Sequence, residues 1–203
     1  MKGTLGLIGK LKTKKFKTNS KASFSWKFNN TLKWPFLKGQ IAWYVGRPIA
    51  RTLGLISAIG ELQAVLIRAD GTTVNYGLLG RRSVTTAFCV FAVDQLQTET
   101  SEWGDFKYHD SGVGTTAENV TDTAMETTDG ESRATGTQTE SSSVAYRSVG
   151  TISYTTTKAI TEHGLFSSAA STTLMDRTKF DAINVVNGDS IQFTYTITWT
   201  AGG

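Results

Sequence analysis

The clearest pattern along the chain is an alternation of apolar and polar residues near its C-terminus. Over residues 190–200, one parity carries large apolar side chains from Ile191 to Trp199, and the other carries Ser, Gln or Thr. This alternation predicts a strand with one buried face. A short apolar run, Ile183–Val186, precedes it, and Asn187-Gly188-Asp189 between the two suits a tight turn. We therefore predict a closing β-hairpin whose aromatic face is covered by other strands or by another subunit.

Similar patterns upstream predict further short strands. Gln63–Arg68, the turn sequence Asp70-Gly71 and an alternating stretch at 74–78 predict a second hairpin. Three more strands are expected, at residues 106–109, 133–140 and 144–156. The alternation fails at Val149 and Gly150, which indicates a β-bulge there.

One segment has a helical pattern. Apolar residues between 84 and 97 recur at spacings of three to five, and Ser83 before them can cap a helix. A buried strand over 88–93 is the competing interpretation. The Gly-, Thr- and Asp-rich stretch at 111–130 is expected to be a loop, with one helical turn near 122–126.

Short strands at intervals of about ten residues, with a single helix, are typical of an all-β domain. We therefore predict a mainly β protein, an antiparallel β-sandwich of jelly-roll-like form. The sandwich body is expected to span residues 62–203, and residues 1–61 are expected to form a basic N-terminal arm.

The charge distribution sets the arm apart from the body. Residues 1–60 contain ten Lys and two Arg and no acidic residue, whereas residues 61–203 contain nine basic and 17 acidic residues, so their formal charges are +12 and −8. A solvated extension is one interpretation. The abundance of aromatic residues favours an arm that docks on an anionic surface, whether nucleic acid, lipid or acidic protein. Its candidate interface residues are Lys10, Lys12, Lys14, Lys15, Lys17, Trp26, Phe28 and Trp34.

The arm contains no pattern typical of secretion or of membrane insertion. Lys10 interrupts the N-terminal apolar run too early for a signal peptide. The apolar stretch at 36–60 is broken by charged residues and by Pro48, so it falls short of the about 20 residues that span a bilayer. We expect no transmembrane segment.

Few residues fit a metal or nucleotide site. Two histidines and one cysteine are too few and too scattered for a Cys/His metal centre. Cys89 lies in an apolar run and is expected to be a buried, inert thiol. Gly112-x-Gly114 lacks the further residues of a nucleotide-binding loop. We expect neither a metal nor a cofactor.

No catalytic motif stands out. Glu162 and His163 are neighbours on a predicted strand, so their side chains point to opposite faces and cannot act together, which favours a structural histidine. Asp176 and Arg177 can form an ion pair or contact a neighbouring subunit, and we treat them as interface candidates. We predict that the protein is not an enzyme.

Several segments carry a resemblance to a known family. GVGTTAENVTDTAMET, RATGTQTE, VAYRSVGTISY and the stretch from AITEHGLF to the terminal TYTITWTAGG follow one another in order. In these the chain resembles a family of small structural proteins of tailed bacteriophages, over about residues 62–203. The resemblance implies a place in the virion, without fixing capsid or tail, and the arm departs from the family's usual short start.

Three functions follow as expectations. The first is a capsid decoration or cement protein that bridges neighbouring subunits through its arm and β body, assembled in the host cytoplasm. The second is a tail-associated, fibre-base or receptor-binding component of the same virion. The third is a nucleic-acid-binding protein that uses the arm, with salt-sensitive binding. We expect phage capsid or tail proteins as partners and a homo-oligomer within the virion, with nucleic acid as a secondary candidate.

Overall fold

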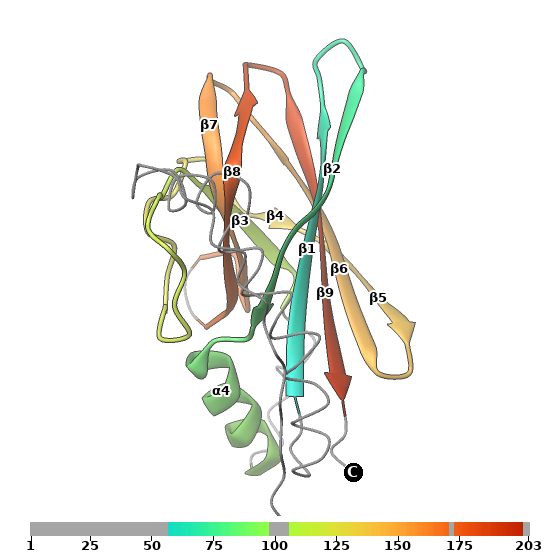
Figure 1. Ribbon diagram of the computed structural model, residues 1–203, viewed down its shortest axis with the longest axis vertical. Helices are drawn as coiled ribbons and strands as arrows, with labels where there is room; N and C mark the ends of the chain where they lie inside the picture. The colour runs from blue at the N-terminus through green and yellow to red at the C-terminus, as the bar shows by residue number, and fades with distance from the viewer. Residues whose placement is uncertain (1–56, 98–105, 171–172, 201–203) are drawn as a thin grey trace, which may run out of the picture. The chain divides into compact units, whose positions relative to one another are not determined.

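The computed structural model describes residues 57–97, 106–170 and 173–200. All of them belong to the second of the two units into which the chain divides, residues 35–203, and we call these described residues the body. The body is mainly β, with two antiparallel sheets and one helix (Figure 1). The prediction of a mainly β fold with a single substantial helix is therefore confirmed for this part of the chain.

The two sheets contain five and four strands. Sheet A consists, in spatial order, of β2 (Thr73–Ser83), β1 (Ser57–Ile67), β9 (Ser190–Thr200), β6 (Ala145–Ser153) and β5 (Thr137–Ser142). Sheet B consists of β4 (Ala134–Thr135), β3 (Tyr108–Gly112), β7 (Lys158–Phe166) and β8 (Leu174–Val185). Helix α4 (Thr86–Gln97) follows β2 along the chain.

Apolar residues from both sheets form one shared core. In β9 the predicted alternation is confirmed up to Ile197, because Ile191, Phe193, Tyr195 and Ile197 are at most 1% exposed, whereas Trp199 on the same face is 36% exposed. The four buried side chains pack with residues of β1, β6, β7 and β8 in one cluster. Burying each large apolar side chain contributes roughly 1.5–3 kcal/mol, so this shared face is a main source of stability.

The predicted C-terminal hairpin is wrong in its pairing. Both strands exist, but β8 lies in sheet B and β9 in sheet A, so residues 186–189 pass from one sheet to the other. The reason is that β9 pairs with β1 along its whole length on one edge and with β6 from Ser190 to Thr198 on the other. No edge of β9 is left for β8. Gly188, at φ 89°, supplies the left-handed turn.

Asp189 ties this sheet-to-sheet turn to the opposite hairpin. Its carboxylate accepts hydrogen bonds from the backbone N–H groups of Val186 and Ala69, at 2.9 and 3.0 Å, and from Arg68 at 2.7 Å. Ala69 belongs to the turn between β1 and β2. These hydrogen bonds hold the pKa of Asp189 below its usual value, with the Val186 N–H as the largest cause.

The hairpin predicted at 63–78 is confirmed as β1 and β2. Gly71 takes a positive φ of 84° in the turn, and the Asp70 carboxylate accepts from the N–H and the hydroxyl of Thr72. Strand β1 begins at Ser57, however. The boundary expected at residue 61 therefore falls inside a strand, and residues 57–61 belong to sheet A.

The strand predicted at 133–140 divides between the two sheets. β4 and β5 are separated only by Gly136, and β4 lies in sheet B whereas β5 lies in sheet A. A Cβ at Gly136 would lie 2.7 Å from His109 Nε2, so the crossing passes close to a buried side chain. The strand predicted at 106–109 is β3, shifted to Tyr108–Gly112.

The bulge expected at Val149 and Gly150 is not present. β6 pairs with β9 in an unbroken register through both residues. Gly150 is explained instead by packing, because a Cβ there would overlap the ring of His109. The break in the alternation at Gly150 therefore reflects the close approach of His109 from the other sheet, and not an extra residue in the strand.

Helix α4 confirms the helical prediction and excludes the competing strand over 88–93. Its cap is Thr85 rather than Ser83, since the Thr85 hydroxyl accepts from the Phe88 N–H at 3.1 Å. Phe88 is buried, whereas Cys89 is exposed, contrary to the buried thiol that we expected. One position on a helix turns the side chain by about 100°, away from the core. The helical turn expected near 122–126 is irregular loop.

Candidate interaction surface

One end of the body carries exposed apolar side chains, and we call it the Trp199 end. In Figure 1, α4, the start of β1, the end of β9 and the turn between β5 and β6 all lie at this end. Its apolar residues are 36–82% exposed, and they are Val90, Val93, Leu96, Val144 and Trp199. Four other exposed apolar residues of the described part, Val74, Tyr76, Val120 and Val186, lie on other elements. The Trp199 end combines its exposed apolar side chains with a groove, which makes it a candidate interaction surface.

Aromatic contacts join the parts of the Trp199 end. The ring of Trp199 lies 6.2 Å from Phe88 of α4, and Phe88 in turn packs edge-on against Phe106 at 5.1 Å. The Trp199 N–H also donates to the carbonyl of Val144 at 2.9 Å. The helix, the end of β9 and the β5–β6 turn therefore form one continuous structure.

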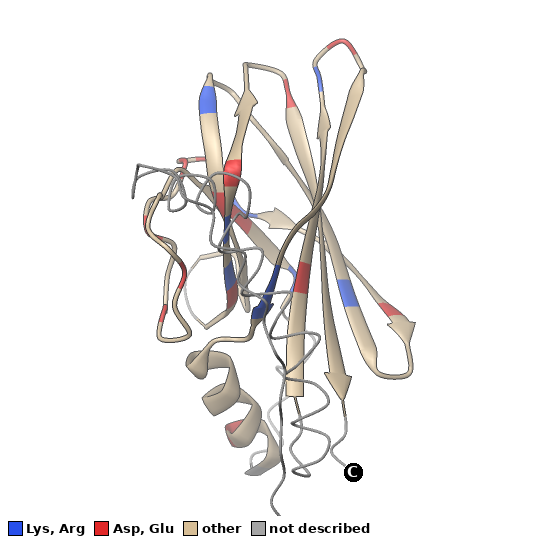
Figure 2. Cartoon of the chain, in the orientation of Figure 1, with Lys and Arg blue, Asp and Glu red and all other residues tan. Residues whose placement is uncertain are grey.

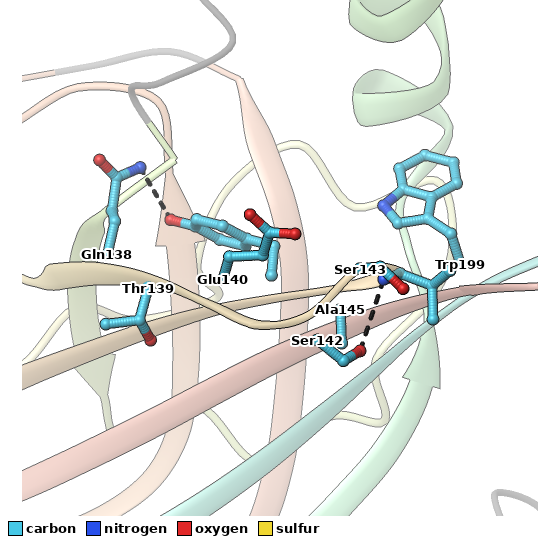
Figure 3. A pocket seen from close by; sticks show the side chains of 9 residues that line it. Gln138, Thr139, Glu140, Ser142, Ser143, Ala145 and Trp199 are labelled. Carbon is cyan, nitrogen blue, oxygen red and sulfur yellow. Dashed lines mark hydrogen bonds between the residues drawn. The ribbon is translucent and has the colours of Figure 1, made fainter.

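A groove of about 640 Å³ opens beside Trp199 (Figure 3). Its lining combines apolar and hydroxyl or amide side chains and contains one acidic and no basic residue, from Gln138, Thr139, Glu140, Ser142, Ser143, Val144, Ala145, Tyr146 and Trp199. On one side of the groove, Gln138 Nε2 donates to the Tyr146 hydroxyl at 2.9 Å. The groove therefore offers an aromatic wall and a hydrogen-bonding edge.

The charged residues are arranged differently from the apolar ones. Figure 2 shows β9 without a charged residue, whereas acidic residues are frequent in the 113–133 loop and in sheet B. Arg133 pairs with Asp110 at 2.9 Å, and Lys158 pairs with Glu131 at 2.7 Å. Arg82 pairs with Glu118. Much of the body's charge is thus engaged in internal contacts.

Glu162 is the centre of the most extensive of these contacts. It is fully buried, and its carboxylate accepts from the Nε of Arg177 at 2.6 Å and from the backbone N–H groups of Gly114, Thr127 and Glu126 at 2.9–3.3 Å. Arg177 extends the network, because its other nitrogens bond Asp122 and Glu126 at 2.9 and 3.2 Å. This network fixes the 113–133 loop to sheet B.

The two glycines of Gly112-x-Gly114 belong to this network. A Cβ at either position would lie only 2.5–2.6 Å from Glu162 Oε1. Gly112 and Gly114, which superficially resemble part of a phosphate-binding loop, therefore leave space for the Glu162 carboxylate.

A second buried polar centre lies inside the core. His109 Nδ1 lies 2.9 Å from His163 Nε2, and His109 Nε2 lies 2.8 Å from Ser148 Oγ. All three side chains are at most 1% exposed. Burial lowers the pKa of His109 to about 4 and lowers that of His163 as well, with the neighbouring His109 as a second cause. Both rings are therefore neutral at neutral pH.

The predicted site residues divide into two groups. Lys10, Lys12, Lys14, Lys15, Lys17, Trp26, Phe28 and Trp34 lie outside the described residues. Asp176 and Arg177 are 2% and 4% exposed, and the contacts that the structure shows for them are internal. Asp176 accepts from the Thr178 hydroxyl rather than pairing with Arg177, which corrects their selection as an interface pair.

Glu162 and His163 contact different parts of the body, in accordance with the expected opposite faces. Glu162 contacts the 113–133 loop, whereas His163 contacts His109 and packs against Phe193 with the rings tilted and their centroids 4.6 Å apart. The hydrogen-bond partners of Glu162 and His163 could not be predicted from the sequence, because most of them lie in segments more than 30 residues away along the chain. Four glycines at 112, 114, 136 and 150 were the one available signal.

Comparison with protein-family models, with curated proteins and with solved structures gives no match. Among the described residues, no helix is long and apolar enough to cross a membrane. The same part of the chain contains no group of His, Cys, Asp or Glu side chains arranged to hold a metal ion.

The Glu162 network generates a stability prediction. Replacing Glu162 with Gln leaves the buried Arg177 without its closest anion, so the free energy of unfolding should fall by about 3–5 kcal/mol. The matched control is Glu140→Gln at an exposed position, where a change within about 0.5 kcal/mol is expected. Urea titration followed by circular dichroism measures both. Equal effects of the two substitutions would contradict the structural role of Glu162.

Asp176 generates a pH prediction. Burial raises its pKa from 3.8 to about 7, so the folded protein holds a proton that the unfolded chain loses above pH 3.8. The stabilising effect of that proton is complete below pH 3.8 and is lost as the pH rises to about 7. At about 1.4 kcal/mol per pKa unit, wild type should lose up to about 4 kcal/mol relative to Asp176→Asn over this range.

The comparison with Asp176→Asn cancels the titration of all other groups, the two histidines included. Unfolding free energies of both proteins are measured from pH 4 to pH 7.5. Parallel pH profiles would show that Asp176 titrates normally in the folded protein.

Proposed function

We propose that the protein is a bacteriophage virion structural protein, most simply a capsid decoration or cement protein that bridges neighbouring subunits. The observation that carries this proposal is the position of the Trp199 end. Ser57, the first residue of β1, pairs with Thr200, next to Trp199. The basic, aromatic-rich segment that precedes Ser57 in sequence therefore joins the body at the end with the exposed apolar residues and the groove.

The body has the properties that a particle component requires. Buried charges are neutralised internally, as with Arg177 and Glu162. We propose that exposed apolar residues and open strand edges make the contacts with other proteins. We infer that the two sheets form a β-sandwich, since they share one core. A jelly-roll-like order and the basic arm are parts of this proposal.

We also propose that the protein is not an enzyme. The His109, His163 and Ser148 side chains resemble parts of a catalytic relay, but they are buried among Gly136, Gly150 and Phe193. A substrate would have to displace the core to reach them. A structural role, which joins β3, β6 and β7, accounts for the same contacts.

Two other functions have an observation in their favour. The groove beside Trp199 and the ordered 113–133 loop would suit a tail-associated, fibre-base or receptor-binding component. The +12 charge of residues 1–60 would suit nucleic-acid binding. Virion localisation and homo-oligomer formation belong to the first two functions.

Copy number separates the capsid and tail positions. A decoration protein should be present in hundreds of copies per particle, because it follows the capsid lattice, whereas a tail component should be present in few. Quantitative gel densitometry of purified virions, calibrated with the recombinant protein, measures this ratio. A low copy number would favour a position in the tail, and absence of the protein from virions would contradict both positions.

The arm generates a prediction about attachment. Replacing Lys10, Lys12, Lys14, Lys15 and Lys17 with Gln in the full chain should weaken particle attachment or self-association by about tenfold or more, or about 1.4 kcal/mol. It should also reduce the dependence of attachment on salt, because fewer ion contacts remain to be screened. Co-sedimentation with particles and analytical ultracentrifugation over a salt series measure the effect.

Replacing the same five lysines with Arg is the matched control, since it keeps the charge and should keep attachment. A chain that begins at Ser57 should retain its β-type circular dichroism spectrum yet lose attachment. If the Gln variant attaches as tightly as wild type, the assembly role of the arm is wrong. Tight, salt-sensitive binding of wild type to DNA of any sequence, without particle attachment, would favour the nucleic-acid alternative.

A further inference from the structure

The inference concerns the groove beside Trp199 and rests on the proposed assembly function. The groove lies at the border of sheet A, because β5 is the last strand in the sheet order and pairs with β6 alone among the described strands. Four of the nine lining residues, Gln138, Thr139, Glu140 and Ser142, belong to β5 itself. The other five lie in the β5–β6 turn, β6 and β9, so the groove has an open sheet edge on one side only.

The two borders of sheet A differ in how they are protected. At the other border, β2 has register shifts in its pairing with β1 and carries Arg81 and Arg82 just before its last residue, Ser83. Such irregularities and positive charges discourage the addition of another strand. β5 contains no Lys, Arg or Pro, and its pairing with β6 is irregular only at its end, between Glu140 and Ser142. The β5 border is thus the more receptive one.

The chain contains one segment whose pattern matches this groove. In residues 24–28, Phe24, Trp26 and Phe28 occupy one parity, and Ser25 and Lys27 occupy the other. This alternation predicts a strand with a continuous aromatic face. Of the lining residues, Val144, Tyr146 and Trp199 offer apolar surface to such a face, and no lysine of the segment would meet a like charge, because the lining has none.

The chain length between this segment and the body permits the contact. Ser57 pairs with Thr200, the residue that follows Trp199 of the groove lining. The 28 residues from 29 to 56 can span on the order of 90 Å when extended, at ~3.3 Å per residue. A segment joined to one body can therefore reach the groove of a neighbouring body.

We propose that residues 24–28 of one copy of this chain dock in the groove of a second copy as an added strand beside β5, with their aromatic side chains toward Trp199 and Tyr146. Main-chain pairing to β5 would supply affinity, and the aromatic face would supply the register. The arm of each body then occupies the groove of the next, which makes the contact heterologous and lets it continue around a ring or lattice.

Disulfide trapping between two differently tagged full-length chains tests this contact. Both chains carry Cys89→Ser, which removes the exposed native thiol. One chain also carries Ser25→Cys, on the parity opposite the aromatic residues, and the other carries Ser143→Cys at the groove. After mixing and mild oxidation, we expect a disulfide-linked heterodimer on a non-reducing gel, with the linked peptides identified by mass spectrometry.

The matched control replaces Ser143→Cys with Thr151→Cys, an exposed position on β6 outside the groove lining. Because docking raises the local concentration of the two thiols, the Ser143 pair should cross-link on the order of tenfold or more above the Thr151 pair. Trp26→Ser in the arm should reduce that yield to the control level, whereas Phe16→Ser, an aromatic position outside the alternating segment, should not.

Three results would overturn the inference: equal yields at Ser143 and Thr151, no cross-link at either, or a cross-link that forms only within one chain carrying both Ser25→Cys and Ser143→Cys. The fate of the proposed function is separate. If the five-lysine variant loses attachment while the Ser143 cross-link fails, the arm acts in assembly at another surface. If the Ser143 cross-link forms and the five-lysine variant still attaches as tightly as wild type, the groove contact is supported and the proposal of charge-driven attachment is wrong.

Discussion

A carboxylate removed from water must receive hydrogen bonds in place of its hydration, and Glu162 is the residue on which this constraint acts most strongly. Its side chain is fully buried, and three backbone N–H groups and the Arg177 guanidinium surround it. The three N–H groups come from the loop between β3 and β4, whereas Arg177 belongs to β8. The charge of one side chain on β7 therefore determines the course of the 113–133 loop, which has little regular structure of its own.

The same principle operates at the second polar centre with neutral groups. His109, His163 and Ser148 satisfy one another inside the core, and the chain comes close enough for this only because Gly136 and Gly150 lack side chains. In each centre a pair of glycines makes room for a polar side chain: Glu162 comes from the neighbouring strand β7, and His109 of sheet B approaches Gly150 of sheet A. Polar groups satisfied in this manner specify which strands meet, because a shift of one residue in register would leave them without partners.

Local features of the fold could be predicted from the sequence, whereas contacts between distant segments could not. The alternation in β9, the β1–β2 turn at Asp70-Gly71 and the helix after residue 84 all follow from patterns within about a dozen residues, and the structure has them. The pairing of β8 with β9 failed because a turn sequence cannot tell whether its two strands enter one sheet or two. The Glu162 network lay beyond reach for a similar reason, since its partners come from residues 114–127 and 177. Among the sites, Trp199 was visible as part of the alternation, but its exposure depends on where sheet B ends.

The central position of β9 has a consequence for the order in which the protein can fold. β9 is the last described strand along the chain, yet it joins β1 to β6 in the middle of sheet A. During synthesis, the β1–β2 hairpin and the β5–β6 hairpin remain two separate halves until residues 190–200 have left the ribosome. Pairing across more than 120 residues of chain is slow compared with hairpin formation. Because Trp199 itself lies in β9, the groove is complete only once this last strand has joined sheet A.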